Sequence, residues 1–216
     1  MAVMTVLMKA VVRQFGHPHG VAGSLAGWVM GHRPSNIQRN RWVVSLLAVQ
    51  PADIVLEIGF GPGIAIAELR RRIGPAGHIY GIDHSYVMLQ QATARNRAAI
   101  RSGQVTLRQA SVEALPTTAI DGPFDAILAV NSVGFWPAPI KNLEDLRRWL
   151  KPGGRIAVAS QPRTGRRGIT PAEVAREITD LLEPAGFIQP RIEHLDLEPP
   201  VVCVIAFNPE PGRDRS

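Results

Sequence analysis

The chain has 216 residues, of which 45% are hydrophobic, enough to form one α/β domain with a complete core. Its single cysteine, Cys203, excludes an internal disulfide framework and a cysteine-based metal site, and its apolar neighbours predict a buried thiol. No apolar stretch is long enough to span a bilayer, and the N-terminus lacks the basic region and cleavage site of a signal peptide. We therefore expect a cytoplasmic protein in a reducing setting.

The net charge of +6 is unevenly distributed. Residues 1–52 contain no Asp or Glu, and the remainder of the chain, which holds all 18 acidic residues, is close to neutral. The basic residues of the first segment are Lys9, Arg13, Arg33, Arg39 and Arg41. Such an asymmetry favours an anionic partner, either a phosphorylated or carboxylated substrate, a membrane surface or a nucleic acid. A solvated arm without a partner is the alternative. Nucleic acid is disfavoured, because no basic stripe interleaved with aromatic residues is present.

The predicted elements begin with an N-terminal basic, glycine-rich arm, residues 1–45. Residues 1–15 are expected to be helical, whereas the glycines and prolines of residues 16–36 predict irregular structure. The apolar pattern of residues 37–49 predicts an amphipathic helix that ends before Pro51. An arm of this composition is a candidate lid over a binding site.

Between residues 46 and 208, predicted strands alternate with predicted helices. The expected strands are Ile54–Ile58, His78–Ile82, Val105–Gln109, Phe124–Val130, Arg155–Ser160, Gln189–Leu195 and Val201–Phe207. The expected helices are Ile64–Ile73, Tyr86–Ile100, Leu143–Leu150 and Pro171–Glu183, with a loop near Leu115 and a turn at Lys151–Gly154. This alternation predicts a doubly wound, mostly parallel sheet, followed by a disordered tail at residues 209–216.

A glycine-rich turn follows the first predicted strand. Gly59, Gly61 and Gly63 alternate with other residues between the strand and the next helix. Glycine is needed where the backbone turns with positive φ or lies directly against a ligand. A turn of this kind at the carboxyl end of a parallel strand is where open α/β sheets bind nucleotide-like ligands.

The spacing of these glycines distinguishes between kinds of nucleotide. A dinucleotide fingerprint would place its third glycine at Ile64, and a phosphate-binding P-loop would require Gly-Lys-Ser/Thr, which is absent. The pattern Glu57-x-Gly59-x-Gly61-x-Gly63 instead resembles motif I of the class I S-adenosylmethionine-dependent methyltransferases.

Further segments resemble this family in the same order along the chain, from about residue 50 to residue 207. They are Gln109–Pro116, similar to the adenine-binding loop, Phe124–Asn131, similar to the fourth strand, and Leu150–Gly154, similar to the turn into the fifth. The resemblance implies a Rossmann-like methyltransferase fold with a seven-stranded sheet and S-adenosylmethionine as the cofactor.

The resemblance also implies roles in cofactor binding. Asp83, at the end of the second strand, would accept hydrogen bonds from both ribose hydroxyls, although it could instead cap the following helix. Glu57 would face the cationic amino-acid end of the cofactor, with a surface-facing strand residue as the alternative. Phe60 belongs to the glycine loop, and His84 would flank the ribose.

The adenine-binding loop departs from the family at one position. Ser111 stands where the family usually has an acid that accepts from the exocyclic amine, and a hydroxyl accepts this hydrogen bond more weakly than a carboxylate. The backbone of Val112 would face the edge of the adenine ring. Asn131, after the fourth strand, is the remaining cofactor-binding candidate.

The acceptor site is expected between the arm and the loop after the fourth strand. His32, Asn131 and Trp136 are the candidate catalytic residues, while Trp136 could equally pack in the core. Arg33 and Arg39 are candidates for binding an anionic acceptor, with solvation of a helix as the alternative. His17 and His19 lack a third metal ligand at useful spacing, so no metal is expected.

These observations predict methyl transfer to a small-molecule or lipid-like acceptor by in-line displacement, in which positioning contributes more than a metal. A non-catalytic methyltransferase-like binding module is the first alternative. A nucleic-acid methyltransferase is the second, disfavoured because Asn131-Ser132-Val133-Gly134 lacks the Asn/Asp-Pro-Pro-aromatic signature of enzymes that methylate base amines. An NAD-dependent oxidoreductase is excluded by the glycine spacing.

Overall fold

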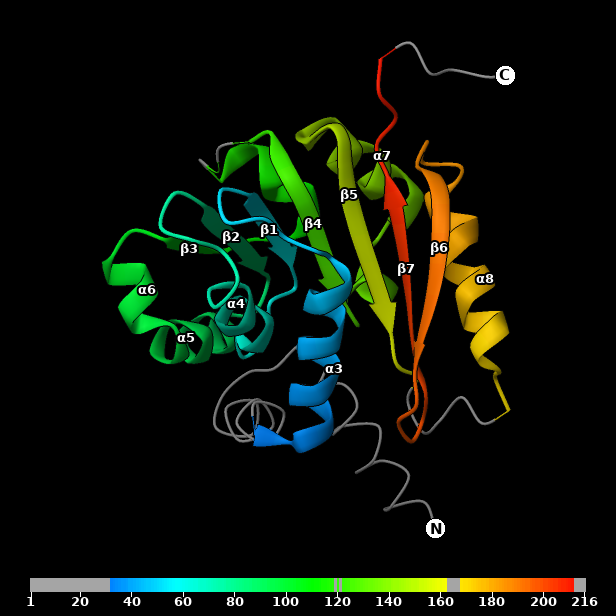
Figure 1. Ribbon diagram of the computed structural model, residues 1–216, viewed down its shortest axis with the longest axis horizontal. Helices are drawn as coiled ribbons and strands as arrows, with labels where there is room; N and C mark the ends of the chain where they lie inside the picture. Colours follow the sequence, from blue (N-terminus) through cyan, green and yellow to red (C-terminus); the bar gives the residue numbers. More distant parts are fainter. Residues whose placement is uncertain (1–31, 119, 121, 163–167, 212–216) are drawn as a thin grey trace.

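The computed structural model describes residues 32–118, 120, 122–162 and 168–211. Its centre is one seven-stranded sheet with the strand order β3-β2-β1-β4-β5-β7-β6 (Figure 1). The strands are β1 (Ile54–Ile58), β2 (His78–Asp83), β3 (Val105–Gln109), β4 (Phe124–Val130), β5 (Leu150–Ser160), β6 (Ile188–Leu195) and β7 (Val201–Phe207). All neighbours are parallel except β7, which is antiparallel to both β5 and β6. The predicted mostly parallel, seven-stranded fold is confirmed.

Helices cover both faces of this sheet. Packed on one face are α3 (Pro34–Leu46), α4 (Ile64–Leu69), α5 (Tyr86–Arg95) and α6 (Arg97–Arg101), and on the other the 3-10 helix η1 (Val112–Thr117), α7 (Pro139–Trp149) and α8 (Pro171–Leu182). A second 3-10 helix, η2 (Val133–Phe135), follows β4. The two faces form two hydrophobic cores, and the central strands are almost continuously apolar because both of their faces are covered.

Helix α3 is an integral part of this architecture. Its residues Val43 and Val44 are completely buried in the core that also contains β1 and α4. The predicted helix begins three residues earlier than expected, because Pro34 occupies its first turn, where the fixed φ of proline favours a helix start. Residues 1–31 lie outside the described part, so the division at residue 45 and the lid stay predictions, as does the disordered tail beyond residue 211.

Several other predicted boundaries were wrong. The expected helix Ile64–Ile73 ends at Leu69, and the expected helix Leu143–Leu150 runs from Pro139 to Trp149. The expected helix Tyr86–Ile100 is interrupted at Asn96, whose side-chain amide donates to the carbonyl of Gly63 at 3.1 Å and to that of Ala92. The fifth strand begins at Leu150 and runs through the expected turn at Lys151–Gly154, where its register against β4 shifts. The loop near Leu115 forms η1.

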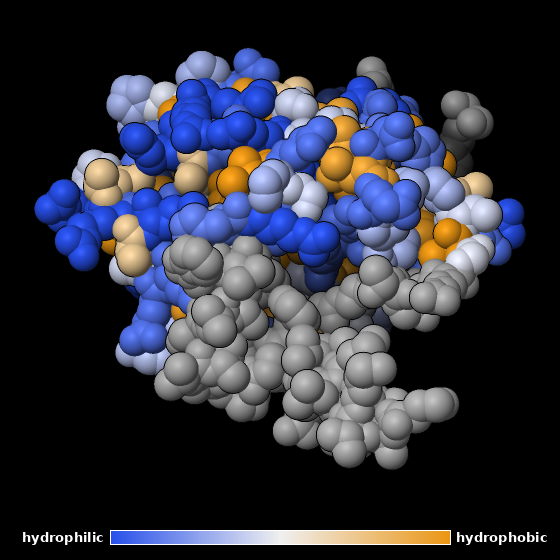
Figure 2. Space-filling model, turned by 90° about the horizontal axis from the view of Figure 1, so that it is seen from below, coloured by the Kyte–Doolittle hydropathy of each residue, from blue (hydrophilic) through white to orange (hydrophobic). Residues whose placement is uncertain are grey.

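The topology brings several strand ends to one edge of the sheet. The chain passes outward from β1 to β2 and β3, then returns to place β4 on the other side of β1, so the strand order reverses between β1 and β4. In open α/β sheets, ligands bind beside the carboxyl ends of the strands at this reversal. Figure 2 views the molecule from this side, and the described surface is mostly hydrophilic with scattered apolar groups.

Candidate functional site

The glycine loop lies between β1 and α4, and its three glycines serve different purposes. All three have positive φ, +78° at Gly59, +50° at Gly61 and +76° at Gly63. A Cβ on Gly59 would lie 2.6 Å from Cβ of Ser132, and one on Gly63 would lie 2.6 Å from Nδ2 of Asn96. A Cβ on Gly61 would meet no atom of the described residues within 4 Å. Packing within the protein therefore requires the outer two glycines, whereas the space beside Gly61 is open to a ligand.

The carboxylate of Asp83 holds this loop in place. One of its oxygens accepts from the backbone N–H of Gly61 at 2.8 Å, and the other accepts from the backbone N–H of Ser85 at 2.9 Å. The side chain that caps α5 belongs to Ser85, which accepts from Met88 N–H. Burial raises the pKa of Asp83, and these hydrogen bonds oppose the rise. Each carboxylate oxygen keeps a further lone pair for a ligand hydroxyl.

Glu57 lies in β1 and is almost completely buried. Burial raises the pKa of its carboxyl well above the usual range, the nearby charge of Asp83 adds to this rise, and a hydrogen bond from the Ile66 backbone N–H opposes it. Because Ile66 is in the first turn of α4, the carboxylate serves this helix as an N-terminal cap. Its Oε2 has no hydrogen-bond partner among the described residues. A surface-facing Glu57 is therefore excluded.

The remaining predicted cofactor residues surround the same strand ends. Phe60 is buried in the core beneath the loop, and His84 is exposed beside Asp83, with 3.7 Å between Nδ1 and the carboxylate. Ser111 is exposed after β3 and precedes η1, which begins at the half-buried Val112. The hydroxyl of Ser111 makes no capping hydrogen bond to η1.

A second group of polar residues joins the ends of β4 and β5 to α3. Asn131, in a left-handed conformation with φ 54°, accepts through Oδ1 from the backbone N–H of Gln161 at 2.7 Å. The side-chain Oε1 of Gln161 accepts from Arg39 Nη1 at 2.7 Å, and its amide donates to the carbonyl of Pro199. Burial, together with the charge of Arg33, lowers the pKa of the Arg39 guanidinium to about 10, so it stays a cation at neutral pH.

The other residues predicted for the acceptor site lie on separate elements and do not form one cluster. Trp136 is half-buried and packs against the core beside η1 and α7, the alternative considered from the sequence. His32 is exposed before α3, and Arg33 occupies the N-cap position of that helix. His17 and His19 lie outside the described residues. Within the described ranges, no group of three or more His, Cys, Asp or Glu residues is arranged to hold a metal ion.

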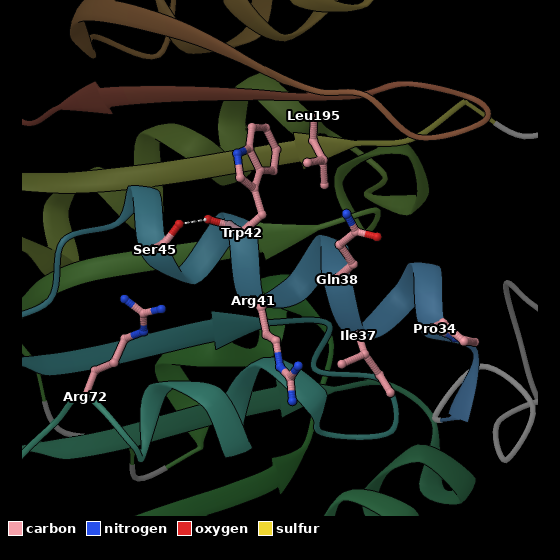
Figure 3. A pocket seen from close by; sticks show the side chains of 8 residues that line it. All are labelled: Pro34, Ile37, Gln38, Arg41, Trp42, Ser45, Arg72 and Leu195. Carbon is pink, nitrogen blue, oxygen red and sulfur yellow. Dashed lines mark hydrogen bonds between the residues drawn. The ribbon is translucent and has the colours of Figure 1, made fainter.

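A separate hollow of about 750 Å³ runs along the outer face of α3 (Figure 3). Trp42 and Leu195 border it on one side of the helix, while Arg41 and Arg72 lie on the other. None of the predicted site residues lines it. Among the described helices, none is long and apolar enough to cross a membrane.

Comparisons with known proteins agree with this geometry. Residues 55–154 match a family model described as a methyltransferase domain. The chain is 31% identical to the uncharacterized methyltransferase YdaC of Bacillus subtilis over 189 residues, which make up 86% of this chain and 98% of that protein. The chain therefore belongs to the class I S-adenosylmethionine-dependent methyltransferases.

More distant relatives are consistent with this assignment. The 2-phytyl-1,4-naphtoquinone methyltransferase of Trichormus variabilis is 31% identical over 109 residues, which cover 50% of this chain and only 47% of that protein. The crystal structure of a SAM dependent methyltransferase from Aquifex aeolicus shares the fold, with a TM-score of 0.62 at 23% identity over 82% of this chain and 98% of that one. As a member of the class I family, this methyltransferase uses S-adenosylmethionine as its cofactor.

Sequence reasoning missed three residues that shape the site. Gln161 connects Asn131 with Arg39 through hydrogen bonds, and Asn96 donates a hydrogen bond to the carbonyl of Gly63. Ser132 fills the space that a side chain at position 59 would need. Of the three, only Gln161 could have been found from the sequence. It directly follows a predicted parallel strand, and the carboxyl ends of parallel strands share the edge of the sheet where ligands bind. Asn96 lies inside a helical pattern that gave no signal.

Proposed function

We propose that this methyltransferase acts on a small-molecule or lipid-like acceptor, with the cofactor bound across the loop between β1 and α4. The observation that carries the proposal is the open space at Gly61, which adjoins the carboxylate of Asp83. The unpaired Oε2 of Glu57 lies beneath the same loop. These groups fit a ligand that carries hydroxyl groups and a cationic amine, as S-adenosylmethionine does.

In this proposal each residue has a distinct task. Asp83 holds the ribose hydroxyls while it fixes Gly61, and Glu57 balances the charge of the ammonium group. Ser111 and the Val112 backbone contact the adenine edge, with Phe60 beneath the loop and His84 beside the ribose. When bound, the cofactor supplies a methyl group on a sulfonium. The leaving group is a neutral thioether, so it needs no acid from the protein.

The chain's contribution to the reaction is then mainly one of position. The acceptor lies beside the end of β4, where Asn131 is fixed by Gln161 and Trp136 packs against the core. His32, before α3, is the candidate base for an acceptor that must lose a proton. Holding the reacting atoms in line and excluding water account for the rate enhancement.

The class of acceptor is supported by the relatives. A quinone methyltransferase among them favours a small, largely apolar acceptor, taken from solution or from a membrane surface. A cytoplasmic setting stays a prediction from cysteine usage. A non-catalytic binding module is the second candidate, and only the exposed serine at position 111 favours it.

Calorimetric titration followed by a turnover assay tests the proposal. Purified protein should bind S-adenosylmethionine and S-adenosylhomocysteine but not NAD. It should then form S-adenosylhomocysteine only when an acceptor is added from a panel of quinols, phenols, carboxylic acids and lipids. Binding without turnover for every acceptor would favour the non-catalytic alternative, and no binding would contradict both.

A further inference from the structure

Arg39 is a half-buried cation whose charge is not neutralised within the described structure. Its Nη1 donates to the neutral amide oxygen of Gln161, while its Nε is buried and has no hydrogen-bond partner among the residues that the structure describes. Burial and a second cation, Arg33, both act on it, and no carboxylate offsets them. A buried guanidinium normally has an anionic partner, because removing a charge from water is unfavourable unless it is paired.

Two segments outside the described residues, the one before α3 and the one after β5, carry no acidic side chain. Residues 1–31 contain no Asp or Glu, and residues 163–167, which follow β5, contain none either. Neither segment can therefore offer Arg39 a side-chain carboxylate. A bound anion is therefore a candidate for the partner that the guanidinium lacks among the described residues.

The position of Arg39 indicates which molecule brings that partner. Arg39 is bonded to Gln161 at the end of β5, and Gln161 is bonded to Asn131 at the end of β4. The guanidinium thus lies on the side of the site away from Asp83 and the β2 end, which the cofactor's ribose occupies in the proposed function. The methyl acceptor is the ligand expected on this side.

We propose that Arg39 binds an oxyanion of the methyl acceptor, so that the enzyme selects substrates carrying a carboxylate or phosphate group. This inference rests on the proposed function, because it assigns the acceptor to the end of β4. A guanidinium offers two parallel N–H donors that match the geometry of either oxyanion, and enclosure strengthens the interaction. Arg33, at the start of α3, adds a second positive charge.

The same helix offers a matched control. Arg41 lies on the opposite flank of α3, borders the outer hollow and is largely exposed, with its Nε 3.8 Å from the carboxylate of Glu68 (Figure 3). Its replacement removes an equal charge from the same helix without touching Gln161. A general effect of net charge would therefore appear in both variants, whereas a specific site would appear only at Arg39.

The experiment measures binding of simple anions to the protein saturated with S-adenosylhomocysteine. The probes are two carboxylates, benzoate and octanoate, and one phosphate, phenyl phosphate. Benzamide and octanamide are the neutral counterparts of the carboxylates. Comparing the affinities of the carboxylates and the phosphate shows which oxyanion the site prefers. We expect at least one anion to bind about tenfold more tightly than its neutral counterpart. Arg39→Gln should abolish this preference, Arg39→Lys should reduce it, and Arg41→Gln should keep it.

The outcomes separate this inference from the proposed function. Affinity for S-adenosylhomocysteine is measured first, and it should be the same in wild type and in all three variants. A wild type that does not bind S-adenosylhomocysteine contradicts the proposed function. Normal cofactor affinity without anion preference, or a preference that survives Arg39→Gln, overturns the inference alone. If Arg39→Gln does not fold, an unchanged preference in Arg39→Lys has the same meaning, because Lys lacks the two-pronged donor.

Discussion

Asp83 accepts a hydrogen bond from the backbone N–H of Gly61 at 2.8 Å, which joins the end of β2 to the middle of the glycine loop. One carboxylate thereby shapes the loop and presents its remaining lone pairs to the same space. The effects of changing Asp83 on loop structure and on ligand binding are therefore coupled.

We expect Asp83→Ala to weaken binding of S-adenosylhomocysteine by about 1–3 kcal/mol, the value of charge-assisted hydrogen bonds. The melting temperature should fall as well, because the N–H groups of Gly61 and Ser85 lose their acceptor. Calorimetry and thermal unfolding measure the two effects, with Asp180→Ala, which removes an exposed carboxylate from α8, as the control. Unchanged affinity in Asp83→Ala would remove this residue from the cofactor site.

Replacing the glycines of the loop one at a time distinguishes those that protein packing requires from the one that leaves room for a ligand. Gly61→Ala should leave the protein folded, at a cost of about 1 kcal/mol for a positive φ, but should weaken cofactor binding at least tenfold. Gly63→Ala should instead lower the melting temperature strongly, because its Cβ would overlap Ala92 and Asn96.

Gly103→Ala provides the control for backbone strain in that comparison. Its φ of +77° is also positive and its Cβ would likewise meet nothing within 4 Å, but it follows α6, away from the loop. If Gly61→Ala binds the cofactor as well as Gly103→Ala does, the assignment of the open space to the ligand is wrong.

Binding of the cofactor should release protons through Glu57. Its pKa is raised by burial, and an ammonium beside Oε2 would lower it again. Calorimetric titrations in buffers of different ionisation enthalpy, repeated at several pH values above 4.5, should therefore show proton release that Glu57→Gln abolishes. Equal proton release in the variant would show that Glu57 does not face the ammonium.

The same pKa determines how the ligand-free protein responds to pH. Because the pKa of Glu57 in the folded state lies well above the ordinary value of 4.5, the folded state binds more protons than the unfolded state between the two values. The free energy of unfolding should therefore decrease as pH rises from 4.5 through the folded pKa. Denaturation of Glu57→Gln over this range should show a weaker decrease than the wild type.

Ser111 offers a test by gain of affinity. If its hydroxyl accepts from the exocyclic amine of adenine, Ser111→Asp should tighten cofactor binding by about 1 kcal/mol, because an ionised acceptor forms the stronger hydrogen bond. Ser111→Asn, which has similar size without the charge, should remain close to the wild type. A weaker complex in Ser111→Asp would place the adenine away from this side chain.

The parts of the structure that the sequence predicted are those determined locally. The glycine loop follows from neighbouring residues, and the place of Asp83 follows from the end of one apolar strand. The start of α3 was missed because the glycines before it outweighed the helix-initiating effect of Pro34. The break at Asn96 depends on the carbonyl of Gly63, 33 residues earlier, and no periodicity within the helix reveals it.

The acceptor side was harder to predict because its contacts are remote in sequence. Arg39 and Gln161 are separated by 122 residues, and only the folded chain brings them together. Charge and residue type identified Arg39 as a candidate, but the amide that orients it could not be found without the fold.

The placement of β7 between β5 and β6 has a consequence for biosynthesis. Strands β1 to β5 pair in an order that a growing chain can extend, whereas the place beside β5 stays open until Val201–Phe207 has been translated. The side-chain amide of Gln161 likewise cannot form its hydrogen bond to the carbonyl of Pro199 until that residue has been translated. A nascent chain can therefore assemble the half that contains Gly61 and Asp83 well before the half that orients Arg39, and shortening the C-terminus should damage the second half first.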